Sequence, residues 1–203
     1  MKADLRKEQI LKVSEKIISQ KGYYETYVED IIKEAKVGKG TFYRYFKSKE
    51  DLYTTLLKKI LIDWEKYAFI DPSQLKSDNM TDLLKELIKR SLKFFAEHQD
   101  LCNIYLKVSP GLTQVFETYI NGFERQMLEY ITIYLQEGVK LGVVRSDLNI
   151  ELVSNMIAGA YMHVDYYYFV LNKSRGRTVN IDDLAEDFYN FIMKGILINQ
   201  QEE

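Results

Sequence analysis

The stretch from Val37 to Phe46, VGKGTFYRYF, concentrates side chains that could recognise a nucleic acid. It combines small residues, hydroxyl groups and two cations, which suits a phosphate-lined groove. Lys39 can neutralise a phosphate, Thr41 can offer a methyl group to thymine, and Arg44 can donate two hydrogen bonds to guanine. These residue types predict DNA-binding chemistry, with a merely solvated basic surface as the alternative.

Two helices are expected before this stretch and a third within it, and together they would position its side chains. Apolar spacing predicts a first helix over 5–20. Thr26 followed by Glu29 has the spacing of a capping box, which predicts a second helix to about Ala35. A third helix is expected over 39–45. Two short helices joined by three or four residues are typical of a helix-turn-helix, whose second helix enters the major groove.

Residues 6–53 resemble the DNA-binding head of the TetR family of bacterial regulators. The run from Val37 to Tyr53 is the most specific part of the match. The matching positions are Ile10-Leu11, Gly22-Tyr23, Thr26, Val28, Ile31, Ala35, Val37, Lys39-Gly40-Thr41, Tyr43, Tyr45 through Glu50, and Leu52-Tyr53. The resemblance implies that the rest of the chain is a body that dimerises and binds a ligand.

The resemblance also implies which residues face DNA. Lys49, at the start of a fourth helix capped by Ser48, and Thr26 would hold phosphates. The DNA-binding residues it implies are Thr26, Tyr27, Gly38, Lys39, Gly40, Thr41, Tyr43, Arg44, Tyr45 and Lys49. Tyr43 and Tyr45 could instead be ordinary packing residues.

Three positions depart from the family pattern. Lys36 stands where a turn glycine is usual, Ile32 where alanine is usual, and Tyr27 where Ser or Thr is common. If Lys36 keeps a left-handed backbone, it carries a conformational cost that glycine avoids.

Charge is unevenly distributed along the chain. The first 50 residues carry 12 Lys/Arg and 8 Asp/Glu, whereas the remainder carries 16 and 22. A basic head on an acidic body suggests that the head meets an anion.

The body is expected to be helical and rich in aromatic side chains. Its expected helices cover about 48–64, 78–98, 101–108, 116–141, 149–171 and 182–198. The 16 Tyr and 10 Phe either form the core or line a pocket for an apolar or aromatic small molecule. The predicted ligand-binding residues are Trp64, Tyr67, Tyr105, Tyr119, Tyr130, Tyr134, His163 and Tyr167.

The last two long helices are expected to pair with their copies in a homodimer. On the final helix, Leu184 and the residues 4, 7, 8 and 11 positions after it form a single apolar stripe. The preceding helix carries small residues, which would let two backbones approach closely. The predicted interface residues are Gly159, Leu184, Phe188, Phe191, Ile192 and Gly195. Packing of this stripe within one chain is the alternative.

The remaining features exclude several classes of protein. No sequence pattern of a metal site, a catalytic nucleophile or a cofactor-binding loop is present, so we expect no metal, no cofactor and no enzyme activity. A single cysteine, Cys102, cannot form an intrachain disulfide. The N-terminus lacks a secretory signal and no apolar run is long enough to span a membrane, so a cytoplasmic protein is expected.

We therefore predict an all-α protein with a DNA-binding domain over 1–48 and a ligand-binding and dimerisation domain over 49–203. The predicted function is a DNA-binding transcriptional regulator: a homodimeric, ligand-relieved repressor on a palindromic double-stranded operator. The runner-up is an activator, or a regulator whose body senses another protein. A helical enzyme or carrier that binds an apolar molecule is the alternative of a different class.

Overall fold

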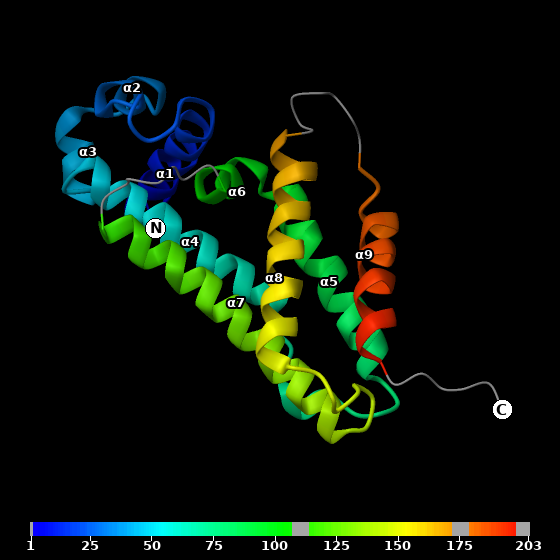
Figure 1. The fold of residues 1–203 in the computed structure, drawn as a ribbon. Coiled ribbons are helices and arrows are strands. Elements are labelled where there is room, and N and C mark those ends of the chain that lie inside the picture. Colours follow the sequence, from blue (N-terminus) through cyan, green and yellow to red (C-terminus); the bar gives the residue numbers. More distant parts are fainter. Residues whose placement is uncertain (1, 107–113, 172–178, 198–203) are drawn as a thin grey trace. The chain divides into compact units, whose positions relative to one another are not determined.

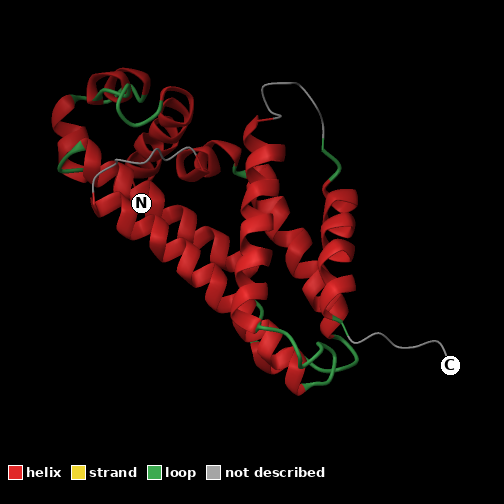
Figure 2. Cartoon of the chain, in the orientation of Figure 1, coloured by secondary structure: helices red, strands yellow, loops and turns green. Residues whose placement is uncertain are grey.

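The computed structural model describes residues 2–106, 114–171 and 179–197, and within these ranges the chain is helical without a β-strand (Figures 1 and 2). The all-α prediction is confirmed. None of the described helices is long and apolar enough to cross a membrane. The elements are α1 (Lys2–Lys21), α2 (Val28–Glu34), α3 (Lys39–Tyr45), α4 (Lys49–Ala68), η1 (Pro72–Gln74), α5 (Met80–Glu97), α6 (Gln99–Leu106), α7 (Gln114–Lys140), α8 (Ile150–Asp165), η2 (Tyr166–Leu171) and α9 (Ile181–Ile196).

The chain divides into two compact units. The first contains residues 1–63 and 98–121, and the second contains residues 64–97 and 122–203. Most of α4, all of α6 and the start of α7 belong to the first unit, and the functional boundary predicted at residue 48 stays a prediction.

The first unit is built on a small aromatic and aliphatic core. Ile10, Ile31, Phe42 and Leu52 are each fully buried and come from α1, α2, α3 and α4 in turn. One face of each short helix is thereby fixed, since burial of a large apolar side chain contributes about 1.5–3 kcal/mol. The polar face of α3 is left on the outside.

The turn between α2 and α3 follows a defined capping pattern. The amide of Lys36 donates to the carbonyl of Lys33, and the amide of Val37 donates to that of Ile32. This pair of bonds is a Schellman motif, in which the first residue after the helix cap has a left-handed backbone. Lys36 occupies that position with φ +51°, so the strained backbone considered for this departure from the family pattern is present.

Substituting Lys36→Gly should stabilise the protein. Glycine adopts the left-handed backbone without steric cost, although it also gains freedom in the unfolded chain, so we expect a net gain of up to about 1 kcal/mol. Chemical unfolding at fixed protein concentration measures it. Lys33→Gly, inside α2, is the matched control and should destabilise by up to about 1 kcal/mol. A lower midpoint for Lys36→Gly would show that its side chain stabilises the turn by more than its backbone strains it.

The second unit packs α5, α8 and α9 with the last turn of α4 and most of α7 (Figure 1). Two ion pairs join α5 to α9: Lys85 with Glu186, and Lys89 with Asp182 at 2.6 Å. Their order shows that the two helices run antiparallel. Asn149 and Asn180 cap α8 and α9 through their side-chain oxygens.

The helix predicted over 149–171 changes its winding near its end. It is an α-helix only to Asp165, and residues 166–171 form a π-helix. Such a segment is rare and is often found at functional sites. It follows directly on a fully buried carboxyl group, Asp165.

Candidate nucleic-acid interface and ligand cavity

Helix α3 has a buried aromatic side and an open polar side. Phe42 is fully buried, whereas Lys39, Tyr43 and Arg44 are exposed. The Arg44 guanidinium lies 5.2 Å from the centroid of the Tyr45 ring, which holds it against the helix surface. The donors of α3 are therefore available to a molecule outside the protein.

Two glycines, Gly38 and Gly40, flank Lys39 at the start of α3. A Cβ atom added at Gly38 or Gly40 would meet no atom of the protein within 4 Å. Internal packing thus does not require glycine at either position. Their lack of side chains lets another molecule approach the first turn of α3 closely.

Thr26 does not have the role expected from the sequence. Its side chain is fully buried and its hydroxyl donates to the carbonyl of Gly22 at 2.8 Å. The residue before α2 is Tyr27, which makes no side-chain capping bond. The predicted capping box is therefore wrong, because that hydroxyl closes the turn after α1. A phosphate contact at the start of α2 stays a prediction.

Lys49 is also engaged within the protein. Its ammonium group donates to the carbonyls of Tyr23 at 2.8 Å and Thr26 at 2.9 Å, and lies 4.3 Å from the Tyr23 ring centroid. Partial burial lowers its pKa. These bonds tie the start of α4 to the turn before α2, and a phosphate that binds Lys49 must displace at least one of them.

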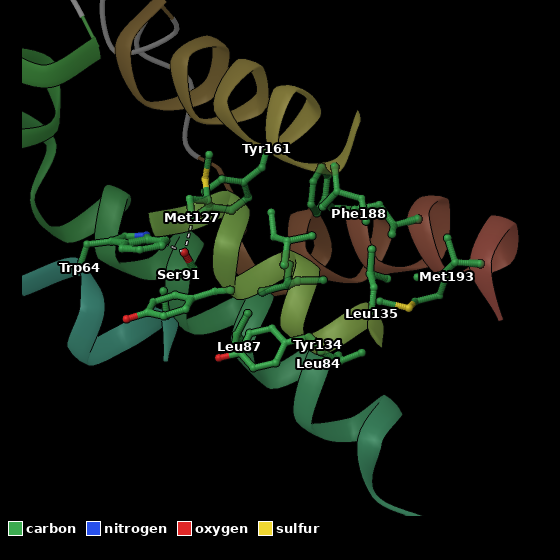
Figure 3. Close-up of a pocket in the computed structure, with 17 residues that line it drawn as sticks. Trp64, Leu84, Leu87, Ser91, Met127, Tyr134, Leu135, Tyr161, Phe188 and Met193 are labelled. Atoms are coloured by element: carbon green, nitrogen blue, oxygen red, sulfur yellow. Dashed lines mark hydrogen bonds between the residues drawn. The ribbon is translucent and has the colours of Figure 1, made fainter. Parts of the chain in front are cut away.

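The second unit contains an apolar cavity of about 90 Å³ between the end of α4 and helices α5, α7, α8 and α9 (Figure 3). Its walls are largely aliphatic and aromatic, with Leu84, Met127, Leu135, Phe188 and Met193 among the contributors. One water molecule needs about 10–15 Å³, and cavities with apolar walls accept apolar molecules. The cavity can therefore hold a small apolar group.

Two tyrosines turn their rings to this cavity while their hydroxyls bind the protein. The Tyr134 hydroxyl donates to the carbonyl of Ile70 at 3.0 Å. The Tyr130 hydroxyl donates to the Glu65 carboxylate at 2.6 Å. Burial, together with this carboxylate, raises the pKa of Tyr130 to about 12. Both hydroxyls are thus engaged inside the protein.

A third polar group lies beside Tyr130, whose ring stacks on that of Trp64 with the centroids 6.1 Å apart. The Trp64 indole N–H donates to the Ser91 hydroxyl at 3.1 Å, and that hydroxyl is hydrogen-bonded to the Tyr161 hydroxyl (Figure 3). All three residues line the cavity. This short chain of bonds joins α4, α5 and α8.

Comparisons with known proteins agree with this architecture. Residues 10–56 match the model of the bacterial regulatory proteins of the tetR family. The uncharacterised HTH-type transcriptional regulator YhgD of Bacillus subtilis is 30% identical over 142 residues, covering 69% of this chain and 72% of the relative. The chain belongs to the tetR family of bacterial regulatory proteins.

Other relatives extend the tetR-family match across the body. The HTH-type transcriptional repressor KstR2 of Rhodococcus jostii is 26% identical over 94% of this chain and 91% of its own. The crystal structure of FadR from Bacillus subtilis in complex with stearoyl-CoA has the same fold, with a TM-score of 0.75, 22% identity and coverage of 93% and 98%. This tetR-family protein is a DNA-binding transcriptional regulator, and the resemblance stated from the sequence is confirmed.

The structure sorts the predicted ligand-binding residues of this tetR-family chain into three groups. Trp64, Tyr130 and Tyr134 line the cavity. Tyr67, His163 and Tyr167 belong to the same unit but do not line it, because they lie on other helix faces. Tyr119 belongs to the first unit, where the Lys58 ammonium lies 5.4 Å from its ring centroid, and the side chain of Tyr105 on α6 is outside the described residues.

The predicted interface residues divide in a similar way. Phe191 is 77% exposed, and Gly159 and Gly195 are also exposed. Leu184 is half-buried. Phe188 and Ile192 are buried and line the cavity, so their assignment to a dimer interface is wrong. The apolar stripe of α9 is broad enough to include both the exposed outer face and the face that lines the cavity. Periodicity alone does not show which residue lies on which face.

Sequence reasoning missed Ser91 and Tyr161. A signal was available for Ser91, since it interrupts the apolar stripe Leu84, Ile88, Leu92 of α5 with a small polar side chain. Its partner Tyr161 gave no comparable signal among so many tyrosines.

Proposed function

We propose that the protein is a homodimeric repressor that an apolar small molecule releases from a palindromic operator. The observation that carries this proposal is the apolar cavity of the second unit, whose Tyr130 and Tyr134 hydroxyls are already bonded to the protein. A cavity of this composition supports binding better than catalysis, so we favour a ligand sensor over an enzyme.

We propose an effector with an aliphatic chain. Two relatives support this class. One is the FadR structure solved with stearoyl-CoA, and the other is a protein of Bacillus subtilis named fatty acid metabolism regulator, 26% identical over 74% of this chain. A flexible chain suits walls with Met127 and Met193, because methionine adapts its shape at little cost.

Arg44 is the residue we propose to read a base. Arg44→Ala should weaken operator binding by about 1–3 kcal/mol and relax sequence preference at one position. Fluorescence anisotropy with operator and single-base variants measures both effects. Lys93→Ala, which removes an exposed cation from the second unit, is the control and should leave both unchanged. Unaltered affinity and preference for Arg44→Ala would contradict the assignment.

Exposed apolar side chains of α8 and α9 support the dimer. Leu152 and Met156 on α8 are 56% and 64% exposed, and with Gly159 they follow one helical face. On α9 the exposed Phe191 lies one turn from Gly195. Exposed apolar side chains gathered on helix faces mark interaction sites, and glycines let two backbones approach closely. A second copy of the chain is the partner we propose.

Release of DNA requires that the ligand bind the DNA-incompetent state more tightly. We propose α4 as the connecting element, because it runs without interruption from Lys49 in the first unit to the cavity residues Trp64 and Ala68. A ligand that moves the last turn of α4 can thereby change the hydrogen bonds that Lys49 donates to the carbonyls of Tyr23 and Thr26.

The test begins with selection of bound sequences from random duplex DNA, which should yield a palindrome. A long-chain acyl-CoA, such as the stearoyl-CoA bound by FadR, is then titrated with and without operator while the fluorescence of Trp64, the single tryptophan, is followed. Operator should weaken ligand binding by about 5- to 150-fold, and the ligand should weaken operator binding by the same factor. Equal ligand affinity in both titrations would rule out that compound as the inducer.

A further inference from the structure

A second, larger pocket lies at the end of the second unit where α5 begins and where α7 and α9 end (Figure 1). Its volume is about 730 Å³, and the residues that line it all belong to this unit. Two backbone contacts join its walls. The amide of Arg145 donates to the carbonyl of Ile196 at 3.0 Å, and Val144 forms an isolated β-bridge with Leu197. The segment after α7 is thereby tied to the end of α9.

This pocket adjoins the apolar cavity at Met193. The buried side chain of Met193 lines both spaces. Methionine is unbranched and has three rotatable bonds, so it changes shape at little cost. Met193 therefore stands between the two spaces, and a change of its rotamer is the smallest movement that would join them.

The cavity by itself is too small for a long chain. An apolar cavity of about 150 Å³ accepts benzene, whereas this one measures about 90 Å³. The aliphatic chain proposed for the effector therefore needs further room, which the adjoining pocket provides. The apolar part of the pocket lining, formed by Leu141, Val143 and Leu197, can continue the contacts that the cavity begins.

The two spaces differ in charge. Among the described residues, those that line the cavity are all uncharged, whereas the pocket is lined by Lys194 and by no carboxylate. Lys194 is exposed in the last turn of α9 and makes no ion pair with another described residue. The lysines that α5 directs at α9 differ in this respect, because Lys85 is paired with Glu186 and Lys89 with Asp182. The pocket thus offers an unpaired positive charge.

We propose that this pocket binds a negatively charged head group of the effector, whose aliphatic chain passes Met193 into the apolar cavity. Lys194 attracts the head group, and the Ser77 hydroxyl and the Asn190 amide are polar groups of the same lining that can hydrogen-bond it. This inference rests on the proposed function and deepens it, because it makes the effector an anionic amphiphile. The carboxylate of a free fatty acid and the phosphates of an acyl-CoA share this chemistry.

The experiment compares decanoate with the neutral 1-decanol at pH 7, each below its solubility limit. Both are titrated into the full-length protein and followed by the fluorescence of Trp64, which lines the cavity. Lys194→Gln should weaken decanoate binding by about 2- to 5-fold, the range of an exposed ion pair, and leave 1-decanol unchanged. Added salt should weaken decanoate binding to the parent and reduce this difference.

Lys140→Gln is the matched control. Lys140 is an exposed lysine at the end of α7 in the same unit, and it does not line the pocket. Its replacement removes the same charge from the unit, so it should leave the ratio of the two affinities unchanged. A parallel titration of decanoyl-CoA identifies the source of the charge, because the head group that the pocket prefers should give the tighter binding and the larger loss in Lys194→Gln.

Ala68→Leu tests whether the chain enters the cavity. Ala68 lines the cavity but not the pocket, so the larger side chain should weaken decanoate and 1-decanol alike in a variant shown to be folded by circular dichroism. Unchanged binding of both in that folded variant would overturn the inference. Equal effects of Lys194→Gln on decanoate and 1-decanol, or binding of 1-decanol alone, would also overturn it while leaving the cavity as a binding site. Failure of all three compounds to bind the parent would instead overturn the proposed function of the cavity.

Discussion

Phe191→Asp should convert the protein into monomers and reduce operator affinity by at least about 100-fold. Phe191 is 77% exposed on α9, on the face proposed to pack against a second copy. An aspartate there would place two carboxylates in the centre of an apolar contact, where burying a charge is strongly unfavourable. In a dimer, binding of one head to the operator raises the effective concentration of the second head, which increases overall affinity by about 10²- to 10⁴-fold. A monomer lacks this increase. Sedimentation velocity and anisotropy with operator measure the two effects.

The control for this variant is Ile62→Asp. Ile62 is 57% exposed on α4 and is not part of the proposed interface, so the same change in polarity should leave the dimer intact. Phe188→Asp would not make the same test, because Phe188 is buried against Tyr161 in its own chain and its replacement should unfold the unit. A stable Phe191→Asp dimer with unchanged operator affinity would exclude this face as the interface.

Asp165→Asn should make the protein more stable at neutral pH, and the gain should grow with pH. Burial raises the pKa of Asp165, so the folded protein keeps a proton that the unfolded chain loses above about pH 4. Stability attributable to this group is therefore complete below pH 4 and declines as pH rises, by up to about 1.4 kcal/mol per unit, until the folded carboxyl ionises. Asparagine has a similar shape and does not ionise, so it escapes this loss.

Urea unfolding of both proteins from pH 4.5 to 8, at one protein concentration, measures the difference. Asp187→Asn on the exposed face of α9 is the control and should not reproduce the pH-dependent gain. If the difference in unfolding free energy between the parent and Asp165→Asn stayed constant across this range, the pKa of Asp165 would be the same in the folded and unfolded states.

The helix-turn-helix head could be predicted almost completely from the sequence. Its elements are short and local, and the positions of Phe42, the glycines around Lys39 and the turn at Lys36 follow from spacing within one contiguous stretch. The capping box predicted at Thr26 is wrong, and the phosphate contacts predicted for Thr26 and Lys49 stay predictions. Thr26 and Lys49 carry groups that can bind either a phosphate or a carbonyl, and the choice depends on the turn after α1, which brings the carbonyls of Gly22 and Tyr23 within reach.

The body required the tertiary structure, although its helices were predicted with similar success. Periodicity shows that Phe188, Phe191 and Ile192 lie on the apolar side of α9, but that side is broad enough to face both the cavity and the outside. Ser91, Tyr161 and Trp64 are 27 to 97 residues apart in the sequence and meet only because α4, α5 and α8 surround one cavity. The sequence by itself thus determined the family, the helices and the head, because these depend on local spacing. Only the packing of distant helices decided which aromatic residues line the cavity, which face outward, and which buried polar groups meet there.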